Sequence, residues 1–212
     1  KTAFPANHPL NTGMIGMHGT KASNTAINKA DLVVVLGARF SDRVISDPSK
    51  FAVNTKFVHI DIDSAEINKN IKTCASIVGD LKDILVKLLP LVNERKPSEW
   101  NDYVSELKNH IPPMYNKKTA LHPKFVCEKV NKIAGEDTII TTEVGQHQMW
   151  VAQFYPFSKP RTLLTSGGLG TMGYGTGAAI GAQTAFPNKT VVHFAGDGSF
   201  RMNCNELATI QN

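Results

Sequence analysis

The sequence predicts an α/β protein with two Rossmann-like, doubly wound parallel-sheet domains, both expected to be incomplete. Apolar runs of strand length alternate with amphipathic stretches in both halves of the 212 residues. Glycine or aspartate follows several of these runs directly, and two arginines lie in the loop after the first run. Those are the positions at which open α/β sheets bind ligands. The chain starts without Met and stops inside an expected helix, which indicates a piece of a larger protein.

The first domain, residues 1–92, is expected to alternate short helices with parallel strands. The run Asp31–Leu36 is continuously apolar after its first residue, which is typical of a strand covered on both faces. In chain order we expect a helix over 21–30, strands over 31–36, 56–62 and 77–80, and an amphipathic helix over 81–92.

Charged side chains follow the first two of these strands. Arg39 and Arg43 are well suited to a pyrophosphate or a ribose, although an ion pair with Asp42 or Asp47 explains them equally well. Asp61 closes the second strand, where an acidic residue is either a ribose partner or a helix N-cap. The GxGxxG pattern is absent, which argues against a conventional NAD site.

Residues 93–121 are interpreted as a linker with one amphipathic helix, and the α/β pattern resumes in a second domain, residues 122–212. The linker helix carries apolar residues at helical spacing: Trp100, Val104, Leu107 and Ile111. In the second domain we expect a helix over 123–134 with Val126, Val130 and Ile133 inward, a strand over 138–142, a helix beginning near 146, a helix stopped by Pro187, and a strand over 190–195.

Glycine is concentrated in the second domain, with seven glycines between Gly167 and Gly181. This density indicates backbone lying directly against a ligand. Asp197 lies between two glycines at a strand end, where a carboxylate suits Mg²⁺ held between protein and phosphate oxygens. A tight turn with a capping aspartate is the plainer alternative. The strand ends near Gly145, Gly167 and Asp197 are expected to face one crevice.

Composition excludes several classes of protein. A hydrophobic fraction of 42% with 19% charged residues is ordinary for a globular chain. The net charge of +5 is not gathered into a basic stripe, which disfavours nucleic acid as a partner. Three widely spaced cysteines support neither a disulfide framework nor a zinc site and favour a cytoplasmic setting. No apolar run has membrane-spanning length, so no membrane partner is expected.

Six segments together resemble the large catalytic subunit of acetohydroxyacid synthase, also called acetolactate synthase. The resemblance runs from about Gly13 to the end of the chain, in the order of the family. The segments are Gly16-Met-His-Gly19, Gly37-Ala-Arg-Phe-Ser-Asp-Arg43, Asp61-Ile-Asp63, Glu143-Val-Gly-Gln-His-Gln-Met-Trp150, Thr165-Ser-Gly-Gly-Leu-Gly-Thr-Met-Gly-Tyr174 and Gly196-Asp-Gly-Ser199.

The resemblance implies two partial cofactor domains. Residues 1–92 would be the later part of a central FAD-binding domain, and residues 122–212 the first part of the domain that holds the diphosphate of thiamine diphosphate. The implied flavin contacts are His18, Gly37, Arg39, Arg43, Asp61, Ile62 and Asp80. The implied thiamine diphosphate contacts are Gly145, Gln146, His147, Gly170, Met172, Gly196, Asp197, Gly198 and Ser199, with Asp197 also a Mg²⁺ ligand.

The implied activity belongs to a parent protein. That protein would condense two pyruvates, or pyruvate and 2-oxobutanoate, with loss of CO₂ in branched-chain amino-acid biosynthesis. It would be a homodimer or homotetramer, with a regulatory small subunit as a candidate partner. The family's catalytic glutamate and second metal ligand fall outside these 212 residues, so the chain alone is expected to be inactive.

Three alternatives remain open. The parent could be another thiamine diphosphate enzyme, of the glyoxylate carboligase or pyruvate oxidase type. The chain could instead be a non-catalytic flavin- or nucleotide-binding module that uses only its first domain. As half of two sheets it could also be too incomplete to bind a cofactor, and its exposed sheet edges would then favour aggregation.

Overall fold

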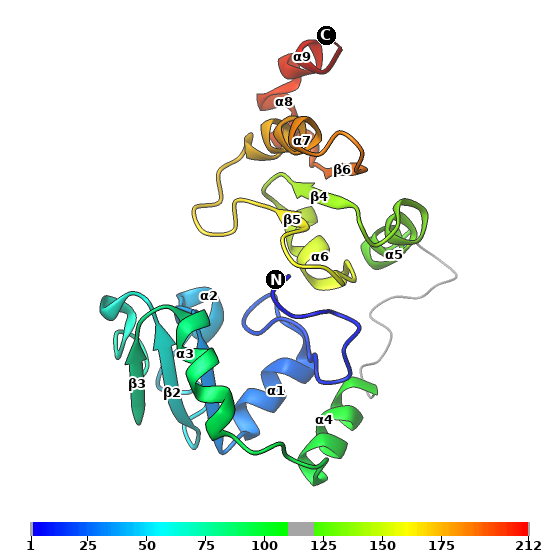
Figure 1. Ribbon diagram of the computed structural model, residues 1–212. Helices are drawn as coiled ribbons and strands as arrows, with labels where there is room; N and C mark the ends of the chain where they lie inside the picture. The colour runs from blue at the N-terminus through cyan, green and yellow to red at the C-terminus, as the bar shows by residue number, and fades with distance from the viewer. Residues whose placement is uncertain (1, 110–120, 212) are drawn as a thin grey trace. The chain divides into compact units, whose positions relative to one another are not determined.

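The computed structural model describes residues 2–109 and 121–211, which form two compact units (Figure 1). We call residues 12–109 the first unit, and residues 2–11 with 121–211 the second unit. Residues 2–11 pack within the second unit, where the Ala6 N–H donates to the Phe157 carbonyl at 2.7 Å. The part of the expected linker at 110–120, with Ile111, lies outside the described residues.

The first unit is built on a parallel sheet with the order β1-β2-β3. The expected strands at 31–36 and 56–62 are confirmed, whereas the third, expected over 77–80, begins and ends two residues earlier, at Ala75–Val78. β1 and β2 pair in the register Leu32 to Lys56 and Leu36 to Ile60. A short helix, α2, begins within the loop that carries Arg39 and Arg43, which we call the arginine loop, and was not predicted. Along the chain the elements are α1 (Lys21–Lys29), β1 (Leu32–Leu36), α2 (Asp42–Ile45), β2 (Lys56–Asp61), the 3₁₀ turn η1 (Ser64–Glu66), β3 (Ala75–Val78), α3 (Leu81–Leu88), the 3₁₀ turn η2 (Leu89–Leu91) and α4 (Glu99–Asn109), which contacts α1.

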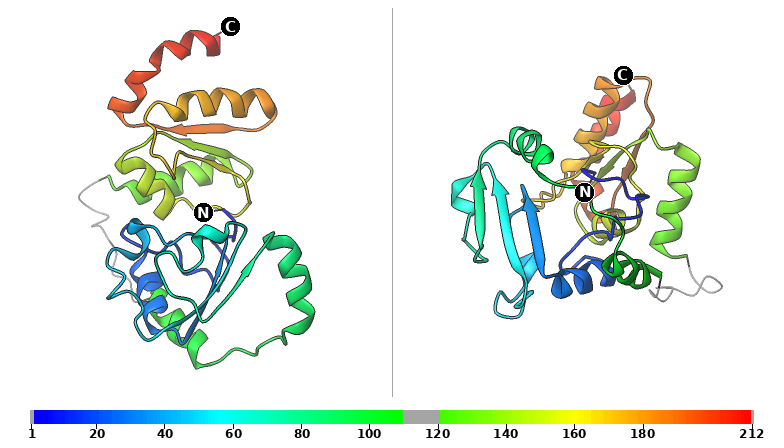
Figure 2. Two further views of the ribbon diagram at one scale, coloured as in Figure 1. Left: turned by 90° about the vertical axis from the view of Figure 1, so that its left-hand side faces the viewer. Right: turned by 60° about the horizontal axis from the view of Figure 1, so that its bottom comes forward.

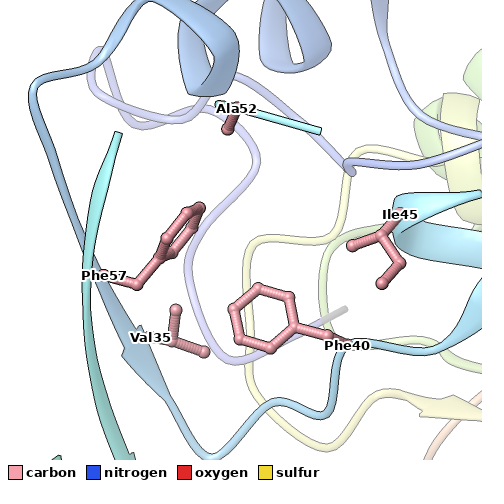
Figure 3. Close-up of a cluster of buried hydrophobic side chains, with 5 residues drawn as sticks. All are labelled: Val35, Phe40, Ile45, Ala52 and Phe57. Atoms are coloured by element: carbon pink, nitrogen blue, oxygen red, sulfur yellow. The ribbon is translucent and has the colours of Figure 1, made fainter. Parts of the chain in front are cut away.

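The core of the first unit lies on one face of the sheet (Figure 3). Its buried members are Val35, Phe40, Ile45, Ala52 and Phe57. Phe40 and Phe57 meet edge to face, with ring centroids 5.6 Å apart. The expectation that strand 31–36 is covered on both faces is wrong, because Leu32 and Val34, on the opposite face, are each 49% exposed. Only the face shared with Phe57 packs into this core, since side chains alternate along a strand.

The second unit also contains a three-stranded parallel sheet, in the order β5-β4-β6. Two parallel sheets with intervening helices confirm the α/β fold class. The two-residue strand β5 was not predicted. In chain order the elements are α5 (Pro123–Ala134), β4 (Ile139–Thr142), α6 (Gln146–Phe154), β5 (Leu163–Leu164), α7 (Tyr174–Ala185), β6 (Val191–Phe194), α8 (Asp197–Met202), the 3₁₀ turn η3 (Cys204–Glu206) and α9 (Leu207–Gln211).

Helices cover both faces of the second sheet. Helix α7 lies along one face, and α5 and α6 lie on the other (Figure 2). The α5 and α6 side holds a buried cluster of Cys127, Ile140, Val151, Tyr155 and Phe157. Burial raises the pKa of the Cys127 thiol to about 11, so this cysteine is a packing residue.

One of the three apolar residues expected to face inward from α5 does not. Val126 and Val130 are partly buried, but Ile133 is 85% exposed. The buried position on this helix is Cys127, which falls one turn before Val130 and so defines the inward face. Throughout the parts of the chain that the structure describes, every helix lacks the length or the apolar content needed to span a membrane.

Candidate functional site

The three strand ends of the second unit are linked by hydrogen bonds at one edge of the sheet. Thr142, the last residue of β4, shares a 2.7 Å hydroxyl–hydroxyl hydrogen bond with Thr165, directly after β5. The backbone N–H of Glu143 donates to the carbonyl of Phe194, the last residue of β6, at 2.9 Å. The segments that follow these strands therefore start side by side, as the parallel pairing requires.

His147 lies between two of these segments. A Cβ atom added to Gly196 would come 3.1 Å from His147 Nδ1, and one added to Gly145 would come 3.1 Å from Cε1 of the same ring. The imidazole of His147 therefore lies between the first turn of α6 and the Gly-Asp-Gly turn after β6. Three of the predicted contact residues are thus brought together.

Two imidazoles at this edge have buried nitrogens without hydrogen-bond partners, Nε2 of His147 and Nε2 of His193. Burial lowers the pKa of both rings. A hydrogen bond to the Glu143 backbone and the Glu143 charge partly oppose the effect at His147, and the Glu143 charge opposes it at His193. Neutral imidazoles therefore predominate at neutral pH. Buried polar atoms in proteins are almost always hydrogen-bonded, so these two unpaired nitrogens are exceptions at this edge of the sheet.

The glycine-rich loop between β5 and α7 is tied to α6. The Gln148 side chain donates to Thr165 Oγ1 at 2.8 Å and to the Ser166 carbonyl at 3.1 Å. The Thr171 N–H donates to Ser166 Oγ at 2.9 Å. Gly170 approaches Val144, with 3.9 Å between its built Cβ and the Val144 side chain. Gln148 and Thr165 were part of the recognised motifs, but sequence reasoning gave them no role.

Glu143 is fully buried and is the main residue that sequence reasoning missed. Its carboxylate accepts hydrogen bonds from the backbone N–H groups of Gly173 at 2.7 Å, Gly175 at 2.8 Å and Thr176 at 3.1 Å. The alternation of side chains along the strand could have predicted its location. Positions 141 and 143 share a face, and Thr141 contacts His193 on the side that α7 covers.

The remaining predicted contacts of the second unit differ in burial. Ser199 is buried, and its hydroxyl donates to the Gly196 carbonyl at 3.5 Å. Gln146 and Gly198 are exposed, and Met172 is 43% exposed. A bound cofactor could cover these exposed residues, which lie next to buried residues such as Glu143 and Ser199.

Asp197 is exposed at the first position of α8, with Gly196 as the N-cap. Among residues 2–109 and 121–211, no three histidine, cysteine, aspartate or glutamate side chains gather around a metal position. One carboxylate nevertheless fits Mg²⁺, because this ion is often held by one or two carboxylates together with phosphate oxygens and water. The donor set therefore suits a metal that arrives with a phosphorylated ligand.

The first unit also gathers predicted residues at the carboxyl edge of its sheet. The Gly37 N–H donates to the Ile60 carbonyl at 2.8 Å, and the Gly79 N–H donates to the Asp61 carbonyl at 2.9 Å. The segments after β1, β2 and β3 thus begin next to one another. This is the edge at which open α/β sheets bind nucleotides.

The turn that carries His18 is fixed beside the arginine loop. Gly16 exchanges two hydrogen bonds with the Asn24 side chain, at 2.8 and 2.9 Å. The Met17 N–H donates to the Arg43 carbonyl at 2.8 Å, and a Cβ atom on Gly16 would overlap that oxygen. His18 and Arg43 therefore lie in adjoining backbone segments. Asn24 was not predicted to matter.

The other predicted residues of this edge differ in their contacts and exposure. Asp80 caps α3, accepting from Lys82 N and Asp83 N. Asp61 is buried, accepts from Asp63 N at 3.0 Å and lies 3.5 Å from His59 Nε2. Ile62 is exposed.

The ion pair considered for the arginines does not form. Asp47 contacts Ser49 and Lys50 instead, and its hydrogen bonds from Ser49 lower its pKa. Within the described parts of the chain, Arg39 and Arg43 make no salt bridge. Both guanidinium groups remain available to an anionic ligand.

Two family models match the chain in the order of its two units. The model described as "Thiamine pyrophosphate enzyme, central domain" matches residues 1–88. The model described as "Thiamine pyrophosphate enzyme, C-terminal TPP binding domain" matches residues 143–212. The second match contains the glycine-rich loop, His147 and the Gly-Asp-Gly turn.

Curated relatives agree with these matches. The chain is 47% identical over 209 residues to the acetolactate synthase isozyme 1 large subunit of Escherichia coli, with 97% of this chain covered. It is 48% identical to a probable acetolactate synthase large subunit of Methanocaldococcus jannaschii, with 99% covered. It is 47% identical to the acetolactate synthase large subunit of Lactococcus lactis, with 98% covered. The chain spans 37%, 37% and 36% of the length of these relatives, respectively.

Proposed function

The chain belongs to the thiamine pyrophosphate enzyme family as a homologue of acetolactate synthase large subunits, and from this premise we propose that its full-length protein is an acetolactate synthase. The proposed reaction joins two pyruvates, or pyruvate and 2-oxobutanoate, with loss of CO₂. The observation that carries the proposal is the convergence of the His147 turn, the glycine-rich loop and the Gly196–Ser199 turn at one sheet edge of the second unit.

The residues of the second unit would hold the diphosphate end of thiamine diphosphate. His147, which lies between Gly145 and Gly196, would be a side-chain contact of the diphosphate. Asp197 would supply one carboxylate to a Mg²⁺ ion shared with the diphosphate. Gly170 and Met172 would lie against the organic part of the cofactor. When bound, thiamine diphosphate supplies the nucleophilic carbon and the electron sink for decarboxylation.

The residues of the first unit would hold FAD. Arg39 and Arg43 have no salt bridge within the described residues, His18 lies in the turn fixed to Arg43, and Gly37 and Asp61 lie at the carboxyl edge of the sheet. Guanidinium groups pair well with the pyrophosphate of a dinucleotide. FAD would be bound without turning over.

The assembly and location of the full-length protein are part of the same proposal. We place it in the cytoplasm, supported by the free thiols of Cys74, Cys127 and Cys204. The assembly would be a homodimer or homotetramer, with a regulatory small subunit as partner. The catalytic glutamate would come from a segment outside these residues, and the chain alone would be inactive.

Product analysis tests the reaction. Full-length protein supplied with thiamine diphosphate, Mg²⁺ and FAD is incubated with pyruvate or with glyoxylate. Acetolactate from pyruvate, lost when thiamine diphosphate is omitted, supports the proposal. Carboligation of glyoxylate alone would move the protein to the glyoxylate carboligases, and flavin binding without either product would favour a nucleotide-binding module.

A further inference from the structure

The buried carboxylate of Glu143 holds the start of α7 against the end of β4. Both carboxylate oxygens are used, since Oε2 accepts from Gly173 N and Oε1 accepts from Gly175 N and Thr176 N. The Thr176 hydroxyl also approaches Oε1, at 3.4 Å. The first backbone N–H groups of a helix have no partner within the helix. Glu143 therefore caps α7 from a residue 30 positions away in sequence.

The cap fixes the end of the glycine-rich loop as well as the helix. Gly173 is in the left-handed conformation with φ of 87°, and its N–H is the donor to Oε2. Its carbonyl accepts a hydrogen bond from the Asn203 side chain, which follows α8. Met172 is its direct neighbour and is half exposed, and Gly170 lies two residues further back. The conformation of the predicted cofactor-facing residues thus depends on an anchor that is itself fully buried.

A histidine of β6 lies beside Glu143. His193 Nε2 lies 3.9 Å from Glu143 Oε1, and its Nδ1 is 2.9 Å from Thr141 Oγ1. Burial keeps this imidazole neutral at neutral pH. Backbone amides, rather than a cation, are therefore the main partners of the carboxylate.

We propose that Glu143 is a positioning residue for thiamine diphosphate, which holds Gly170–Gly173 in the binding-competent conformation through the amides of Gly173, Gly175 and Thr176. The inference rests on the proposed function, since it concerns the same cofactor site. Glu143 does not touch the cofactor; it acts through the loop. Because Glu143 already occupies the N–H groups at the start of α7, the diphosphate cannot bind there. The segments around His147 and Gly196 would bind it instead.

Glu143→Gln in the full-length protein tests this assignment. The amide has the size of the carboxylate but only one acceptor oxygen, so one of the two groups of N–H donors loses its partner. We expect the Kd for thiamine diphosphate, measured by titration calorimetry with Mg²⁺ present, to rise about tenfold or more. The KM for the cofactor should rise in parallel, while kcat at saturating cofactor and the Kd for FAD stay near the wild-type values.

Two further variants keep the test decisive. Glu143→Asp retains two acceptor oxygens on a shorter arm and should raise the Kd above the wild-type value, but by less than Glu143→Gln does. If the glutamine variant fails to fold, a wild-type Kd in the aspartate variant would overturn the inference. Asp137→Asn removes an exposed carboxylate of the same unit that pairs with Lys159 and Lys189, and should leave the Kd unchanged.

Two results would overturn the inference. One is a Glu143→Gln protein that binds thiamine diphosphate as the wild type does. The other is a variant that loses thiamine diphosphate, FAD and thermal stability together, with no rescue by aspartate, which would make Glu143 a residue of the fold alone. A wild-type protein that binds no thiamine diphosphate would contradict the proposed function instead.

Discussion

Gly175 and His193 are in contact at the point where α7 crosses the second sheet. A Cβ atom at residue 175 would lie 2.5 Å from Cε1 of the His193 ring and 2.6 Å from the carbonyl oxygen of Thr142. The backbone of α7 thus lies directly on the strand ends. This close approach places the Gly175 N–H within reach of Glu143.

Gly175→Ala is expected to destabilise the full-length protein. The methyl group would displace backbone that cannot move independently of β4, at a cost of about 1–3 kcal/mol. Gly177→Ala is the matched control, because the same helix has open space at that position. There the substitution should stabilise the helix by about 1 kcal/mol. Urea unfolding of both variants measures the difference, and equal effects would refute the contact.

Asp197→Ala is expected to abolish Mg²⁺-dependent binding of thiamine diphosphate. The exposed carboxylate at the start of α8 is the one proposed metal ligand in this chain. Calorimetric titration of the full-length variant, with Mg²⁺ and with EDTA, measures the effect. Affinity retained in the presence of Mg²⁺ would remove Asp197 as a ligand. Asp137→Asn controls for the loss of a surface carboxylate.

Arg39→Ala is expected to weaken FAD binding without changing the affinity for thiamine diphosphate. The guanidinium group has no salt bridge among the residues that the structure describes, so its removal leaves no charge unpaired there. Loss of a charge-assisted contact to pyrophosphate costs about 1.5–3 kcal/mol. Flavin fluorescence on titration with FAD measures it, with exposed Arg95→Ala as control. An equal loss of both cofactors would make Arg39 structural.

His193 is expected to make stability depend on pH. Its pKa in the folded protein is below the ordinary value of about 6.5, because burial disfavours the charged ring. The unfolded chain binds the proton more readily, so the contribution of His193 is complete above about pH 6.5 and is lost as the pH falls. His193→Asn should lose less stability than the wild type between neutral and mildly acidic pH. His8→Asn, in the exposed N-terminal segment, is the control. The prediction is contradicted if the pH dependence of the unfolding free energy is the same in His193→Asn as in the wild type, or if His8→Asn changes it equally.

Much of the fold could be predicted because apolar strands leave a strong local pattern, whether one or both of their faces are covered. The apolar runs that become β1, β2, β4 and β6 are short, are rich in β-branched residues and are followed by glycine or charge. The same pattern predicts which residues reach the carboxyl edge of each sheet. Asp61, Gly145 and Gly196 are candidates on this pattern, whereas Gly37 is a candidate only through the family resemblance.

The remaining features depend on contacts that no local pattern records. The two residues of β5 are a strand only because they pair with Ile140 and Thr141. The helical spacing of Val126, Val130 and Ile133 predicts that Ile133 faces inward, yet Cys127, the neighbour of Val126, is the buried position and Ile133 is exposed. Glu143 looks like one more polar residue after a strand. Its role depends on α7 crossing above it, which is a tertiary relationship.

The most direct test of the central claim is an experimental structure of the full-length protein with thiamine diphosphate and Mg²⁺. The account predicts the diphosphate at the carboxyl edge of the β5-β4-β6 sheet, beside His147 and Gly196, with Mg²⁺ about 2.1 Å from a carboxylate oxygen of Asp197. A diphosphate bound at the start of α7 in place of Glu143, or away from this edge altogether, would contradict it.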